Sequence, residues 1–202
     1  ASRNFRRIRY LVVMKYRRTF LNLVVAAAVA FLPLVEGARA QDMPAADLDR
    51  LMGELARPDQ ERWQRIERQI QREWSRSGSA VADYLFQRGQ EALRDGETEA
   101  AIAHFSAVID HAPDFPEAWN ARATAWFMAN RLGPAMADIE EALARNPLHF
   151  GALAGLGAIL EQVERPEAAR AAFAAALELH PHRPGLRQAV DRLDRALAGR
   201  AL

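Results

Sequence analysis

The sequence predicts an all-α protein: an α-solenoid of three helical hairpins, with a further helical hairpin on its N-terminal side and a capping helix on its C-terminal side. The composition favours helices, because half of the 202 residues are apolar, only 8% are aromatic, and alanine and leucine predominate beyond residue 40. The arrangement follows from three adjoining windows of 34 residues, 82–115, 116–149 and 150–183, which repeat one pattern without a gap.

The three windows carry the same kinds of residue at the positions that pack helices together. Position eight is small, position twenty-four is large and apolar, and position thirty-two is proline, in the order Gly89, Ala123, Gly157, then Phe105, Ile139, Phe173, then Pro113, Pro147, Pro181. Small residues let the two helices of a hairpin approach closely, and large ones fill the gaps between hairpins. Proline cannot continue a helix, so it helps to end the second helix of each window.

This pattern resembles the tetratricopeptide repeat family over residues 82–183. The first repeat departs from it at two positions, where Arg88 replaces leucine and Ala92 replaces an aromatic residue. The resemblance implies stacked hairpins whose first helices line a concave peptide-binding groove. Carrying the family's groove positions onto this sequence gives Phe86, Gln90, Arg94, Asn120, Thr124, Phe127, Met128, Ala154, Ala158, Glu161 and Gln162.

The predicted groove is apolar at its centre, with neutral polar groups around it. Such a face suits a partner helix or an extended segment with two or three apolar anchors. Some members of the family clamp a partner's C-terminal carboxylate with lysine and asparagine, but this chain has no lysine after Lys15, and only Asn120 matches. We therefore do not expect capture of a chaperone tail. In the alternative, Phe86 or Phe127 packs against a neighbouring helix instead of lining the groove.

Residues 14–40 have the features of a signal peptide. A basic segment that contains Arg17 and Arg18 precedes an apolar run over residues 20–35. General secretion is the expected route, although the segment that begins at Arg17 also resembles a twin-arginine signal. An uncleaved membrane anchor is the alternative, and the run of 16 residues is shorter than the roughly 20 that span a bilayer.

The end of this leader predicts a cleavage site. Ala38 and Ala40 provide the small-x-small pattern of a signal-peptidase site, so cleavage leaves Gln41 as the mature N-terminus. Met14 is then the expected natural start, and residues 1–13 are an upstream extension. The mature protein is expected in the periplasm, with membrane contact only through the leader during export.

Helical segments are predicted on both sides of the repeats. Residues 41–81 form an amphipathic hairpin with an apolar stripe from Trp63 to Trp74, which we expect to pack on the first repeat as a cap. The alternative is that Trp63 and Trp74 drive dimerisation. Residues 184–202 carry one apolar stripe of leucine and valine, and we expect them to form the C-terminal capping helix and tail.

Charge and motifs exclude several classes of function. Residues 1–40 hold eight of the 27 basic residues and one of the 26 acidic ones, which leaves the rest of the chain at a net charge of −6. No basic stripe is present for a nucleic-acid partner. The chain has no cysteine, phosphate-binding loop, metal-ligand helix motif or nucleophile elbow, so neither an enzyme nor a cofactor is expected.

His149, His180 and His182 are interpreted as polar turn residues. His180 and His182 are the only close pair, and a metal site at this pair is the alternative, although no third ligand is evident. The sequence as a whole predicts a non-enzymatic periplasmic scaffold that binds a protein or peptide, in the assembly of an envelope complex. The alternatives are a self-associating structural protein and a membrane-anchored accessory subunit with an uncleaved leader.

Overall fold

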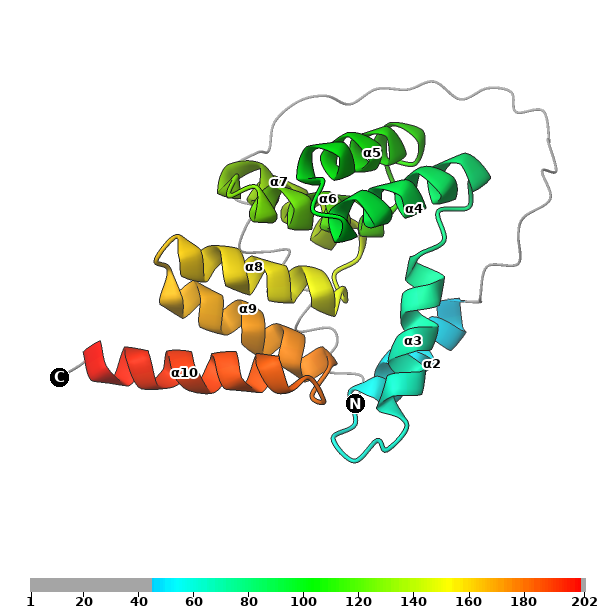
Figure 1. Ribbon diagram of the computed structural model, residues 1–202. Coiled ribbons are helices and arrows are strands. Elements are labelled where there is room, and N and C mark those ends of the chain that lie inside the picture. Colours follow the sequence, from blue (N-terminus) through cyan, green and yellow to red (C-terminus); the bar gives the residue numbers. More distant parts are fainter. Residues whose placement is uncertain (1–44, 201–202) are drawn as a thin grey trace, which may run out of the picture. The chain divides into compact units, whose positions relative to one another are not determined.

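The computed structural model describes residues 45–200, which form helices joined by turns (Figure 1). The helices are α2 (Ala45–Leu55), α3 (Trp63–Trp74), α4 (Ala80–Arg94), α5 (Thr98–His111), α6 (Pro116–Met128), α7 (Leu132–Arg145), α8 (Phe150–Gln162), α9 (Pro166–Leu179) and α10 (Pro184–Arg200). The predicted all-α fold is confirmed. The predicted leader, with Ala38, Ala40 and Gln41, lies outside the described residues. Among the helices described, none combines the length and apolar character needed to cross a membrane.

Three consecutive hairpins make up the solenoid: α4 with α5, α6 with α7, and α8 with α9. Each hairpin meets the next through its second helix, so α5 lies against α6 and α7 lies against α8. α10 packs on α9 at the C-terminal end of the stack (Figure 1). These pairings confirm the predicted solenoid and put a helix on the last hairpin, where the capping helix was expected.

The two helices of a hairpin approach closely where the sequence places a small residue. A Cβ atom on Gly89 would lie 2.5 Å from the ring of Phe105, and one on Gly157 would lie 2.8 Å from the ring of Phe173. In the second hairpin the same positions hold Ala123 and Ile139, which are both buried. Glycine thus occurs where its partner is a phenylalanine ring, and alanine occurs where the partner is smaller.

One position of each hairpin reverses the chain between its two helices. Gly96, Asn130 and Glu164 lie 34 residues apart and all have a left-handed backbone, with φ angles of 79°, 57° and 57°. Glycine adopts this conformation without steric cost, asparagine tolerates it, and glutamate is strained by it. The backbone geometry therefore repeats through the array, although the side chain does not.

The N-terminal end of the stack explains the departure at Arg88. In α6 the face that meets the preceding hairpin is apolar, and Ala118 and Ala125 are fully buried there. The equivalent positions in α4 are Tyr84, which is 63% exposed, and Glu91, which pairs with Arg88 at 2.7 Å. Terminal repeats need a polar outer face because no further repeat covers them. Arg88 and Glu91 supply part of that polarity.

The N-terminal hairpin does not cap the first repeat, so that prediction is wrong. α2 and α3 pack on each other, and α3 lies along the turns that precede α8 and α10. Trp74 stacks on His149 with ring centroids 4.7 Å apart, and Trp63 stacks on His182 at 5.5 Å. Because the outer face of α4 is polar, the aromatic stripe of α3 buries more apolar surface by packing on these turns.

Candidate functional site

The predicted groove residues lie on the first helices of the three hairpins, α4, α6 and α8. Five are exposed: Gln90, Arg94, Thr124, Met128 and Gln162. Five more are half-buried: Asn120, Phe127, Ala154, Ala158 and Glu161. Ten of the eleven residues therefore keep part of their surface open on these helices.

Phe86 is the exception, and the prediction that it lines the groove is wrong. Its side chain is 3% exposed. The ring packs against Phe105 at 5.5 Å and against Phe115 at 5.3 Å between centroids. Phe86 therefore belongs to the core of the first hairpin. Helical spacing alone did not distinguish these two roles.

The candidate groove has apolar side chains at its centre. Met128 is 55% exposed at the end of α6, beside the half-buried Phe127. On α8, Ala154 and Ala158 are half-buried and present little side chain. Methionine is flexible and polarizable, so it adapts its shape to a bound apolar group. This combination offers one bulky apolar contact next to a shallow surface.

Neutral polar groups adjoin this apolar centre on α6. The Thr124 hydroxyl donates a hydrogen bond of 3.0 Å to the main-chain carbonyl of Asn120. Among residues 45–200, no hydrogen bond is formed by the half-buried side-chain amide of Asn120. An amide with a free donor and a free acceptor can pair with the main chain of an extended segment. The Asn120 amide therefore has a donor and an acceptor available for a ligand.

The charged groups differ between the two ends of the groove. Arg94 is exposed on α4, and its Nε donates a 3.3 Å hydrogen bond to the carbonyl of Gln90. On α8, Glu161 pairs with Arg192 of α10 at 2.7 Å. The first end therefore carries an exposed cation, whereas the third-repeat end is neutralised. Sequence reasoning missed Arg192, because the 34-residue pattern stops before α10.

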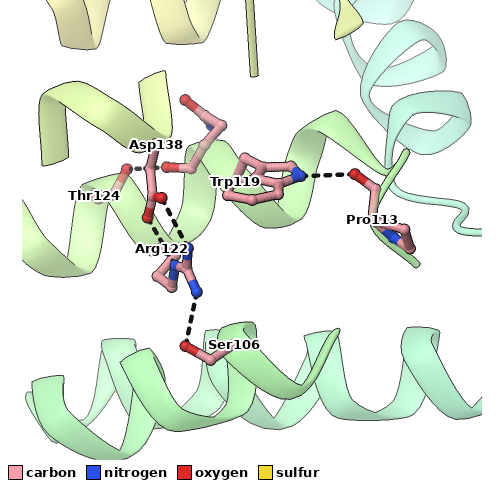
Figure 2. A network of polar contacts seen from close by, with 7 residues as sticks. Ser106, Pro113, Trp119, Arg122, Thr124 and Asp138 are labelled. Atoms are coloured by element: carbon pink, nitrogen blue, oxygen red, sulfur yellow. Dashed lines mark hydrogen bonds and ion pairs between the residues drawn. The ribbon is translucent and has the colours of Figure 1, made fainter. Parts of the chain in front are cut away.

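A polar network behind α6 fixes the helix that carries the groove centre (Figure 2). Arg122 donates two hydrogen bonds to the carboxylate of Asp138, at 2.7 and 2.8 Å, and a third of 2.9 Å to the hydroxyl of Ser106. Asp138 is 5% exposed. Figure 2 also shows the indole of Trp119 donating to the carbonyl of Pro113, at 2.8 Å. These bonds join α5, α6 and α7.

The histidines of the turns contact the N-terminal hairpin. His149 accepts a 3.1 Å hydrogen bond from the amide of Ala152 on Nδ1, and its Nε2 lies 2.6 Å from Glu117, so Nε2 carries the proton. His182 donates from Nε2 to the carbonyl of Arg57 at 2.9 Å. Within the described range, no group of three possible ligands could hold a metal ion. These histidines lie at the turns, as interpreted from the sequence, and they also form the surface on which α3 packs.

His180 is the most enclosed of these histidines. It is 0% exposed, and neither ring nitrogen forms a hydrogen bond. Glu67 of α3 lies 3.4 Å from Nε2 and is also paired with Arg183 at 2.9 Å. Burial lowers the pKa of His180 below its ordinary value, and the Glu67 carboxylate only partly offsets this. His180 is thus held neutral against the hairpin.

Both tryptophans of the hairpin are engaged within the chain. Trp63 contacts His180 and His182, and Trp74 contacts His149 and Phe150. The alternative of dimerisation through this pair rested on their being free to meet a second chain. While α3 packs on these turns, the two tryptophans are engaged within the chain, so they do not support dimerisation.

Comparison with known proteins identifies the family. A model of the tetratricopeptide repeat matches residues 86–138 and 135–184. A TPR repeat-containing protein of Rhizobium etli is 34% identical over 167 residues, which cover 82% of each chain. The chain therefore belongs to the tetratricopeptide repeat family.

Solved structures support the same fold. The first TPR of Spaghetti (RPAP3) bound to an HSP90 peptide is 26% identical, with a TM-score of 0.58 over 59% of this chain and 95% of that one. The Yersinia enterocolitica secretion chaperone SycD in complex with a YopD peptide is 14% identical, with a TM-score of 0.52 over 60% and 92%. A Thermobaculum terrenum O-GlcNAc transferase, 24% identical, has a TM-score of 0.54 over 56% and 22%. The last two show the fold alone.

Proposed function

We propose that this protein is a non-enzymatic scaffold of the bacterial periplasm, which binds a helical or extended segment of a partner protein and assists the assembly of an envelope complex. The observation that carries the binding role is the exposed Met128 beside Phe127, with the unpaired amide of Asn120 on the same helix. An apolar anchor next to a free backbone-pairing group suits a peptide ligand.

Membership of the repeat family supports a protein or peptide as the ligand. The Spaghetti (RPAP3) domain is described in complex with an HSP90 peptide. The ligand class proposed here differs from an acidic tail held by lysines, because this chain has no lysine beyond Lys15. A segment with an apolar anchor for Met128 and an acidic group near Arg94 fits the groove better.

The periplasmic location rests on residues 14–40, which have the order of a signal peptide. Cell fractionation followed by N-terminal sequencing tests it directly. We expect periplasmic protein that begins at Gln41. Protein found in the cytoplasm with an intact leader contradicts the location, and protein retained in the membrane with that leader favours the anchored alternative.

Photo-crosslinking in cells tests the groove. A crosslinking amino acid at Thr124, which is exposed on α6, is expected to capture one discrete partner, identified by mass spectrometry. The second substitution Met128→Glu puts a charge where the apolar anchor binds and should abolish that product. Glu140→Lys, at an exposed position on α7, is the matched control and should leave it intact.

Three outcomes contradict the groove assignment. A product that survives Met128→Glu shows that the captured protein binds elsewhere. Crosslinks only between copies of this chain favour the self-associating alternative, and an absence of any product removes the groove as the binding site.

A further inference from the structure

The N-terminal hairpin rests on a small group of aromatic and histidine side chains, which we call the hairpin seat: His149, Phe150, His180 and His182. Trp74 contacts the first two, with ring centroids 4.7 and 5.0 Å apart. Trp63 contacts the last two, at 5.6 and 5.5 Å. Three of the four members of the seat are therefore histidines, and His180 is the one that is fully buried.

We propose that the docking of the α2–α3 hairpin is controlled by acid: protonation of His180 releases the hairpin from the hairpin seat, while the three repeat hairpins stay folded. This device is independent of the groove on α4, α6 and α8.

The geometry around His180 makes a charged ring costly. The ring lies edge-on to Trp63, with an interplanar angle of 66°, and to Phe150, with an angle of 86°. Neither nitrogen has a hydrogen-bond partner, and the side chain is fully buried. A buried imidazolium needs two acceptors for its two N–H groups. The docked hairpin provides one candidate, Glu67, at 3.4 Å.

Every element packed on His180 affects whether its ring is neutral or protonated. α3 brings the Glu67 carboxylate, which favours the proton, but that carboxylate is shared with Arg183. The turn before α10 brings Arg183 and His182, which disfavour the proton. α8 brings Phe150, which has no charge. The end of α9, where His180 is the C-cap, has free carbonyls that favour a cation. Burial is the largest influence, and it lowers the pKa.

The sign of the pH effect follows from this lowered pKa. Once the hairpin leaves, His180 is hydrated and its pKa returns towards the ordinary value of 6.5. The released form then binds a proton more readily than the docked form. Docking is strongest above pH 6.5 and weakens as the pH falls through the docked-state pKa. For one proton, the ratio of released to docked protein rises by at most about tenfold per pH unit.

The connection to α4 allows the hairpin to move without unfolding the repeats. Residues 75–79 link α3 to α4, and Gly78 has a positive φ of 77°. A hollow of about 380 Å³ lies between the end of α3, this link and the turn before α6, lined in part by Trp74, Gly78 and Pro113. One side of the link is therefore open, whereas Ser77 is tied to Asp83 of α4 by hydrogen bonds of 2.9 and 2.6 Å.

The absence of native cysteine makes a distance measurement direct. Spin labels on Arg68→Cys in α3 and Arg187→Cys in α10, both exposed sites, report hairpin docking by double electron–electron resonance. On the chain as isolated from cells, we expect a narrow distance distribution at pH 7.5 and a broad one at pH 5. Labels on Ala103→Cys in α5 and Ala171→Cys in α9 are the control pair and should not respond. An unchanged 68–187 distance down to pH 5 overturns the proposal.

Two further measurements assign the response to His180. His180→Phe keeps an aromatic ring but cannot take a proton, so it should abolish the change in distance, whereas His104→Phe should leave it intact. If His180→Phe does not fold, NMR titration of the native chain decides, because the His180 ring must titrate below pH 6.5 with the midpoint of the distance change. A different midpoint, or a response that persists in His180→Phe, overturns the proposal.

Discussion

The repeat hairpins and the N-terminal hairpin are held in place by different kinds of contact. Within the repeats, Gly89 faces Phe105 and Gly157 faces Phe173, and both pairs are buried and apolar. The N-terminal hairpin is held by stacked rings and by bonds between distant parts of the chain, such as that of His182 to Arg57, which lie 125 positions apart. The comparison teaches that only contacts between sequence neighbours leave a periodic signature.

The repeats also differ among themselves where the two helices of one hairpin meet. At positions seven and twenty-three, the second repeat has Arg122 and Asp138, which form an ion pair, whereas the third repeat has Leu156 and Ala172. The same backbone therefore accommodates either an ion pair or two apolar side chains at positions seven and twenty-three.

Arg122→Leu should destabilise the repeat array most. It leaves the buried Asp138 carboxylate without its partner, which costs about 3–5 kcal/mol of unfolding free energy. The double substitution Arg122→Leu with Asp138→Ala reproduces the third repeat and should recover most of that loss. Urea unfolding followed by circular dichroism measures both. Arg88→Leu, at the same position of the exposed first repeat, is the control and should change stability by less than about 0.5 kcal/mol.

Gly89→Ala should reduce stability by about 1–3 kcal/mol, because its Cβ would lie 2.5 Å from the Phe105 ring. Adding Phe105→Ile copies the alanine–isoleucine pair of the second repeat and should cost less than the two single effects added together. A thermal double-mutant cycle tests this coupling. Gly53→Ala in α2 has nothing within 4 Å of the new Cβ and serves as the control. Additive effects of the two substitutions would contradict direct packing of residue 89 on the Phe105 ring.

Trp74→Ala should loosen the N-terminal hairpin and spare the repeats. Loss of stacking on His149 and Phe150 removes about 0.5–1.5 kcal/mol in addition to the buried area. Hydrogen exchange should therefore show faster exchange in α2 and α3, with unchanged protection in α6 to α9. Arg72→Ala, at an exposed position on α3, should leave exchange unaltered. A uniform loss of protection would show that the hairpin and repeats unfold as one unit.

Glu164→Gly should stabilise the protein by about 1 kcal/mol, the smallest effect of the series. Glu164 has the left-handed backbone that glycine adopts freely, with φ of 57°, in the same turn position as Gly96. The reverse change, Gly96→Ala, should destabilise by a similar amount. Melting temperatures of the two variants give the comparison, and a stabilising Gly96→Ala would contradict the shared turn geometry.

The sequence predicted the repeat array well and the candidate site in part. The 34-residue spacing identified three hairpins, because each packs mainly on its neighbours and so repeats the same demands for small and large residues. The groove positions were carried over from the family, and all but Phe86 keep part of their surface open. Arg192 and the Arg122–Asp138 pair lacked any periodic signal, since each occurs once.

The helices, their turns and the stacking of hairpins could be predicted from the sequence, because all of them depend on residues close together in the chain. The position of the N-terminal hairpin could not be predicted in this way, because an apolar stripe specifies that a helix packs but not which surface it packs on. Trp63 stacks on His182 and Trp74 stacks on His149. The first repeat needs no apolar cap, because Arg88 and Glu91 make its outer face polar.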